Sequence, residues 1–154
     1  MGGYVTKRDF TGSFHTFYCD GGEGNKEAII FLHGSGPGAN AESNWRYILP
    51  AFSDRYRVLA PDVYGFGKTD HPEDPKKTFW EWTRLSVEQV IGLMDLHGIE
   101  KAHLVGNSMG GVISLNCLMT APERFGKVIL MGSGGGETPS TLEVFRMSQF
   151  FRDP

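Results

Sequence analysis

Four short runs of apolar residues lie along the chain, and turn or helix residues follow each of them. They are residues 28–32 (AIIFL), 56–60 (YRVLA), 102–105 (AHLV) and 127–131 (KVILM). Runs that are apolar at nearly every position are typical of strands buried on both faces of a parallel sheet. Residues 4–10 and 14–19 differ, because turn residues 11–13 separate two segments with the composition of a hairpin.

Between the second and third runs, apolar residues recur at the spacing of one helix face. These residues are Val87, Val90, Ile91 and Met94. We expect the helix to begin at a capping box formed by Ser86 and Gln89 and to end at Gly98. It would cross over the sheet between two parallel strands.

Two further helices are expected. Residues 109–119 are apolar nearly all round, which favours a helix packed against the sheet. A shorter helix is expected from about Asn44 to Phe52, although Pro50 disfavours its second half. Strands that alternate with helices predict a right-handed α/β fold, with a ligand site at the carboxyl ends of the strands.

Composition narrows the class of protein. With 154 residues and 40% hydrophobic content, the chain is long enough for one domain with a substantial core. A net charge of -3 without blocks of like charge argues against nucleic acid and membrane surfaces, so we expect a small-molecule partner. The chain has two cysteines, no apolar run of membrane-spanning length and no secretory signal at its N-terminus. A cytoplasmic protein fits these features.

Residues 106–111 (GNSMGG) place one serine, Ser108, between two glycines, after an apolar run and before a helical one. This arrangement predicts a nucleophile elbow, a sharp strand-to-helix turn that exposes a serine hydroxyl. We expect Gly111 to permit close packing of the helix on its strand. The alternative is a plain turn whose serine caps the next helix.

Residues 33–38 (HGSGPG) follow the first buried run and are predicted to form the oxyanion hole. The small residues Gly34 and Gly36 let the backbone approach a substrate closely. The two donors would be the backbone amides of Ser35 and Met109. The alternatives are an ordinary glycine turn or a phosphate loop, but a phosphate loop needs Lys and then Ser or Thr after its last glycine.

Neighbouring polar residues have structural interpretations. We expect His33 to brace the backbone of the oxyanion segment. The carboxylates Asp62 and Asp70 flank a glycine loop and are interpreted as parts of backbone turns, because two carboxylates alone specify no metal geometry. No metal or organic cofactor is expected. The role of the aromatic cluster at residues 79–82 (FWEW) stays open.

Taken together, these segments resemble the α/β-hydrolase superfamily, and more narrowly the meta-cleavage product hydrolases of bacterial aromatic degradation. The resemblance rests on residues 33–39, 43–45, 60–62, 65–70 and 106–111. It implies that Ser108 is catalytic, that the Ser35 and Met109 amides form the oxyanion hole, and that Asn44 and Asn107 line the substrate site. Asn44 could instead be a helix N-cap, and Asn107 a strained elbow residue.

The resemblance also implies a reaction. A 2-hydroxy-6-oxo-2,4-dienoate first becomes a ketone that acts as an electron sink. The serine, activated by a histidine, attacks the distal carbonyl, 2-hydroxypenta-2,4-dienoate leaves, and water releases a carboxylic acid. Rival interpretations are another serine hydrolase of this fold, an esterase or a proline iminopeptidase-like enzyme, and a non-catalytic ligand binder or fragment.

The chain departs from the family pattern after Ser108, because residues 109–154 contain no histidine. We therefore expect a chain truncated at the start of the lid, with residues 1–136 forming the N-terminal part of the hydrolase core and residues 137–154 beginning the lid. Residues 140–151 are predicted to be the first lid helix. The 154-residue chain alone is expected to show no turnover, whereas a full-length relative could form a homo-oligomer.

Overall fold

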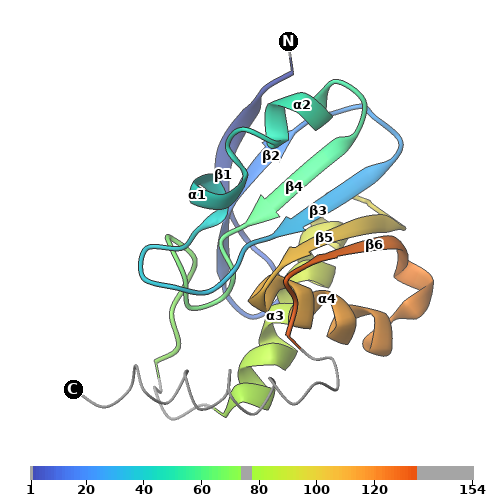
Figure 1. The fold of residues 1–154 in the computed structure, drawn as a ribbon. Coiled ribbons are helices and arrows are strands. Elements are labelled where there is room, and N and C mark those ends of the chain that lie inside the picture. The colour runs from blue at the N-terminus through green and yellow to red at the C-terminus, as the bar shows by residue number, and fades with distance from the viewer. Residues whose placement is uncertain (1, 74–77, 135–154) are drawn as a thin grey trace.

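The computed structural model describes residues 2–73 and 78–134. Six strands form one sheet in the order β1-β2-β4-β3-β5-β6 (Figure 1). The strands are β1 (Tyr4–Phe10), β2 (His15–Gly21), β3 (Ala28–Leu32), β4 (Arg57–Pro61), β5 (Ala102–Asn107) and β6 (Phe125–Met131). The last four are mutually parallel, whereas β1 and β2 form an antiparallel hairpin that continues the sheet beside β4. The predicted hairpin and mostly parallel sheet are confirmed.

Helices cover both faces of this sheet (Figure 1). They are α1 (Ala41–Trp45), α2 (Leu49–Ser53), α3 (Phe79–Leu96) and α4 (Met109–Thr120). Alternate residues of β3 serve the two layers: Ile30 and Leu32 pack in the cluster with α3 and α4, and Ile29 and Phe31 pack with α1 and α2. This alternation follows from the pleat of a strand and explains why β3 is apolar throughout.

The N-terminus of α3 differs from the prediction. The helix begins at Phe79 rather than near Ser86, because Thr78 and Glu81 form the capping box. The Ser86 hydroxyl instead donates to the carbonyl of Trp82, one turn earlier in the same helix. The predicted capping box of Ser86 and Gln89 is therefore wrong, while the helix does end before Gly98, as expected.

The short helix expected from Asn44 to Phe52 is two helices. Asn40 is the N-cap of α1 and forms a capping box with Ser43. Pro50 lies in the first turn of α2, where a missing N–H costs no helical hydrogen bond. Proline therefore starts a second helix here instead of interrupting the first one.

The predicted boundary between residues 136 and 137 and the predicted lid helix at residues 140–151 lie outside the described residues. They stay predictions. At the β6 edge of the described sheet, three large apolar side chains are exposed: Ile129, Leu130 and Met131.

A buried polar network joins the hairpin to the amino end of the sheet. The Arg57 guanidinium, on β4, pairs with Asp20 and donates to His97 Nδ1 at 3.1 Å. His97 Nε2 lies 3.0 Å from the Tyr18 hydroxyl, which donates to Asp9 at 2.7 Å. Because His97 Nδ1 accepts from a guanidinium, the ring fits this network only in its neutral form.

This network predicts a pH dependence of stability. Burial, and after it the positive charge of Arg57, lower the pKa of His97 below its ordinary value of 6.5. Lys7 lowers this pKa slightly further, while the negative charges of Asp20 and Asp9 oppose the shift. The unfolded chain therefore takes up a proton first as the pH falls. We expect the contribution of His97 to the free energy of unfolding to be fully present above about pH 6.5. It should decline as the pH falls from there toward the pKa of His97 in the folded chain.

Urea unfolding midpoints between pH 7.5 and pH 5 measure this dependence. The variant His97→Gln should show a smaller loss over that range, retaining the share due to His33, whose pKa is also lowered by burial. Replacement of the exposed His71 by Gln is the matched control. Equal pH slopes for the original chain and His97→Gln would refute the interpretation.

Candidate active site

The candidate nucleophile sits on a strained turn between β5 and α4. Ser108 has φ 50° and ψ −110°, and it is the one non-glycine residue with positive φ in the described part of the chain. Such a conformation costs on the order of 1–3 kcal/mol and is typical of functional sites. The Ser108 amide donates to the carbonyl of Met131 at 2.8 Å, which ties the turn to β6. The side chain of Ser108 is exposed and forms no capping hydrogen bond to α4.

Glycines around Ser108 allow this turn to be tight. A methyl group on Gly106 would lie 2.5 Å from the carbonyl oxygen of Gly110, and one on Gly110 would lie 2.6 Å from the carbonyl carbon of Leu32. A methyl group on Gly111 would collide with Ser133. Helix and strand do pack closely, but the glycines that allow it are Gly106 and Gly110, whereas Gly111 lies against Ser133, beyond the end of β6.

The glycine-rich segment after β3 lies against this turn. A methyl group on Gly34 would be 3.2 Å from Asn107 Nδ2 and 3.4 Å from Ser108 Cβ. Gly34 is buried, whereas Ser35 and Gly36 are exposed. The two segments singled out in the sequence, about seventy residues apart, therefore meet at the carboxyl ends of neighbouring parallel strands.

The two candidate oxyanion donors are backbone amides. Met109 is the first residue of α4, so its N–H has no partner within the helix and lies at the positive end of the helix dipole. Ser35 follows Gly34 directly in the loop. Within residues 2–73 and 78–134, neither amide donates to a protein acceptor. Both are therefore free to donate to a bound ligand.

Asn44 and Asn107 are hydrogen-bonded to each other. Asn107 Nδ2 donates to Asn44 Oδ1 at 3.0 Å, and the backbone amide of Gly34 donates to the same oxygen at 3.2 Å. The interpretation of Asn44 as an N-cap is wrong, because Asn40 caps α1 and Asn44 lies within the helix. The strained position is Ser108 rather than Asn107, which is the last residue of β5.

His33 braces the loop, as expected. Its Nδ1 lies 2.8 Å from the carbonyl oxygen of Gly34, and its Nε2 accepts from the amide of Val63 at 2.9 Å. Because Nε2 is an acceptor, Nδ1 carries the proton and donates to Gly34. The side chain is fully buried, and burial lowers the pKa of His33, which keeps the ring neutral. Because both ring nitrogens are hydrogen-bonded to backbone groups, His33 holds the backbone of Gly34 and Val63 in place.

Asp62 holds the next loop in place. Its carboxylate accepts from the amide of Ala41 at 2.8 Å and from that of Lys68 at 2.9 Å. Asp70 contacts Arg8 and the amide of His15. No three His, Cys, Asp or Glu side chains gather as metal ligands in the described residues. The structure confirms the interpretation of Asp62 as part of a backbone turn, whereas the Asp70 carboxylate binds the strands of the hairpin instead.

Sequence reasoning assigned Gln89 to a capping box and missed its buried contacts. Its side-chain amide donates to the carbonyl of Asp62 at 2.9 Å and to the Thr16 hydroxyl at 3.0 Å, while its oxygen accepts from Tyr64 at 3.0 Å. Gln89 thus supports the loop that His33 also contacts. The sequence signal for a buried Gln89 is its place beside the apolar positions of a helix. Its partners could not be predicted, because they lie far from it along the chain.

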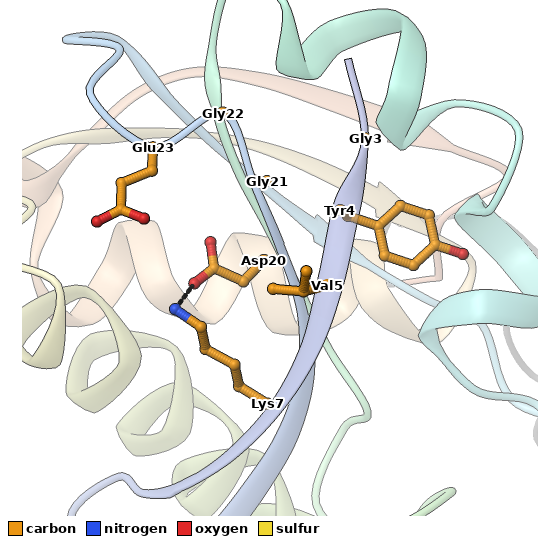
Figure 2. A pocket seen from close by; sticks show the side chains of 8 residues that line it. All are labelled: Gly3, Tyr4, Val5, Lys7, Asp20, Gly21, Gly22 and Glu23. Atoms are coloured by element: carbon orange, nitrogen blue, oxygen red, sulfur yellow. Dashed lines mark ion pairs between the residues drawn. The ribbon is translucent and has the colours of Figure 1, made fainter. Parts of the chain in front are cut away.

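A surface hollow of 330 Å³ lies elsewhere, beside the ends of β1 and β2. Figure 2 shows the Lys7 ammonium directed at the Asp20 carboxylate, and the two groups are 2.6 Å apart. Gly21, which also lines the hollow, pairs with Val58 near the start of β4, so the hollow is at the opposite end of the sheet from Ser108. It has no part in the candidate active site.

Comparison with known proteins places this geometry in a family. The family model for the alpha/beta hydrolase fold matches residues 27–154. The chain belongs to the alpha/beta hydrolase fold family. The hydrolase fold predicted from the sequence is therefore confirmed.

Two of the most similar proteins are named as dienoate hydrolases, and a third is named as a serine hydrolase. The chain is 48% identical over 125 residues to 2-hydroxy-6-oxo-6-phenylhexa-2,4-dienoate hydrolase of Burkholderia cepacia, covering 80% of this chain and 41% of that protein. The structure of the enzyme of the same name from Rhodococcus sp. strain RHA1 superposes with a TM-score of 0.87 at 41% identity, covering 100% of this chain and 55% of that one. A serine hydrolase from the polyaromatic hydrocarbon-degrading bacterium Cycloclasticus zankles is 45% identical, with a TM-score of 0.88, over 99% of this chain and 53% of that one.

The predicted resemblance to meta-cleavage product hydrolases is confirmed by these similarities. The chain spans about half the length of the curated relatives it matches. The share of each relative that is covered runs from 38% to 53%. None of its described helices is long and apolar enough to cross a membrane.

Proposed function

We propose that this chain provides the nucleophile elbow and oxyanion loop of a serine hydrolase that cleaves a carbon–carbon bond in 2-hydroxy-6-oxo-2,4-dienoates. The observation that carries the proposal is the strained, exposed Ser108 with the glycine-rich loop packed against it. The names of the relatives at 40% identity or more support the substrate class.

In this proposal each residue has a stated part. The Ser108 hydroxyl attacks the distal carbonyl of the keto form, and the amides of Ser35 and Met109 stabilise the negative charge that develops on its oxygen. Gly34 and Gly36 permit the close approach. Asn44 and Asn107 line the substrate site, where amides can donate to and accept from an enol-keto system. The base that activates Ser108 is a histidine, and no histidine occurs in residues 109–154.

The reaction needs an electron sink because the leaving group is a carbanion. Ketonisation of the dienol supplies that sink, so that cleavage releases 2-hydroxypenta-2,4-dienoate and leaves an acyl group on Ser108. Water then releases the carboxylic acid. We further propose a small-molecule substrate, no nucleic-acid or membrane partner, and a cytoplasmic location, which the mild charge and two buried free cysteines support.

A chimera tests the activity. It consists of all 154 residues followed by the C-terminal part of the Rhodococcus enzyme, which can be joined at a defined point because the alignment covers the whole chain. We expect the chimera to hydrolyse 2-hydroxy-6-oxo-6-phenylhexa-2,4-dienoate with a kcat/KM at least about 100-fold above that for a simple aryl ester. The 154-residue chain alone should show no turnover.

The outcome separates the rival functions. A preference for the ester would favour an esterase, and cleavage of N-terminal proline peptides would favour an iminopeptidase-like enzyme. A folded chimera without hydrolysis of any of these substrates would favour a non-catalytic protein. Any of these three results would overturn the proposal.

A further inference from the structure

The hydrogen bonds around Asn44 fix the orientation of two side-chain amides. The backbone N–H of Gly34 can only donate, so the atom of Asn44 that lies 3.2 Å away is the acceptor Oδ1. The Asn107 atom 3.0 Å from that same oxygen must then be the donor Nδ2. One carbonyl oxygen therefore accepts from the oxyanion loop and from the end of β5.

We propose that Asn44 is a positioning residue that holds the oxyanion loop in place through this carbonyl oxygen. Gly34 immediately precedes Ser35, so a hydrogen bond that holds the Gly34 amide in place also restricts the position of the Ser35 amide. Asn107 immediately precedes Ser108. The Asn44 oxygen thus links the residues next to the proposed donor and the proposed nucleophile, and it sets their separation.

Asn44 can do this because α1 is anchored at both ends. Asn40 caps the first turn, and the amide of Ala41 donates to the buried Asp62 carboxylate at 2.8 Å. At the other end, Trp45 is buried with its ring 5.3 Å from that of Phe31 on β3. The helix is therefore fixed to the strand from which the oxyanion loop emerges.

The structural effect is tested by hydrogen exchange of the Gly34 amide, measured by NMR on the 154-residue chain. In Asn44→Leu, which keeps the side-chain shape without an acceptor, we expect the amide to exchange about tenfold faster. Asn44→Asp retains an acceptor oxygen and should restore slow exchange. Asn116→Leu is the matched control, because Asn116 donates within α4 to the carbonyl of Val112 and should leave Gly34 unchanged.

The functional effect rests on the proposed function and is measured on the chimera. Asn44→Leu should lower kcat about 100-fold, by more than it raises KM, since a misplaced donor stabilises the transition state poorly. Unchanged Gly34 exchange in Asn44→Leu, or equally fast exchange in Asn44→Leu and Asn44→Asp, would overturn the inference. A loss confined to KM would also overturn it and would assign Asn44 to substrate contact alone. Failure of the unsubstituted chimera to turn over would instead count against the proposed function, and the exchange measurement would still decide the inference.

Discussion

Replacement of Ser108 by alanine in the chimera is expected to lower kcat for dienoate hydrolysis on the order of 10⁴-fold or more. The variant keeps the amides of Ser35 and Met109 and the backbone turn, and it loses only the oxygen that forms the acyl bond. Substrate affinity, measured by direct titration, should change little for the same reason.

Ser108→Gly serves as the matched variant. Both substitutions remove the nucleophile, but glycine adopts positive φ without strain, so Ser108→Gly should be more stable than Ser108→Ala by about 1 kcal/mol or more. Comparable turnover by either variant and the original chimera would show that Ser108 is not the nucleophile. Equal stability of the two variants would contradict the strain inferred at φ 50°.

Replacement of Gly110 by alanine is expected to destabilise the protein by about 3 kcal/mol or more. Helix propensity alone predicts the opposite sign, because alanine is better than glycine inside a helix by about 1 kcal/mol. At this position, however, the added methyl group would lie 2.6 Å from the carbonyl carbon of Leu32 and 2.9 Å from the carbonyl oxygen of His33. These are backbone atoms of the sheet and of the oxyanion segment, so they cannot move aside as a flexible side chain can.

Urea unfolding midpoints measure this effect, with Gly3→Ala as the control. A methyl group on Gly3 would meet no atom within 4 Å, so that variant should be neutral to within about 0.5 kcal/mol. A Gly110→Ala variant as stable as the original chain would mean that α4 does not pack against the end of β3 as described.

The strands and the elbow could be predicted because their signals are local. Each parallel strand contains a run of mostly apolar residues, and the elbow combines an apolar run, a serine between glycines and a helical segment within a few residues. The approach of Gly34 to Ser108 follows from topology, since β3 and β5 are adjacent parallel strands that end at the same edge.

Helix starts were harder to predict because several candidate caps lie close together. Asn40, Ser43 and Asn44 can all cap a helix, and the choice of Asn40 depends on the contact between the Ala41 amide and Asp62, which lies 21 residues further along the chain. Thr78 and Glu81 have the capping-box spacing. The amphipathic pattern that begins at Val87 nevertheless favours a start of α3 near Ser86, later than the observed start at Phe79.

Apart from the bracing role of His33, the buried polar contacts could not be predicted from the sequence. Arg57 lies in a run that is otherwise apolar, and its partner Asp20 is 37 residues away on a strand of opposite direction. Gln89 donates to the carbonyl of Asp62 and accepts from the amide of Tyr64, and these groups come together only in the folded chain. Such contacts depend on three-dimensional neighbours rather than on sequence spacing.

The most direct test of the account is to find the covalent intermediate. The chimera is mixed with 2-hydroxy-6-oxo-6-phenylhexa-2,4-dienoate, quenched in acid during turnover and digested with trypsin, which releases residues 102–124 as one peptide. We expect a benzoyl group on that peptide, assigned by fragmentation to Ser108 and not to Ser114, and absent from the Ser108→Ala chimera. A benzoyl group on any other residue, or steady turnover by the Ser108→Ala chimera, would contradict the account.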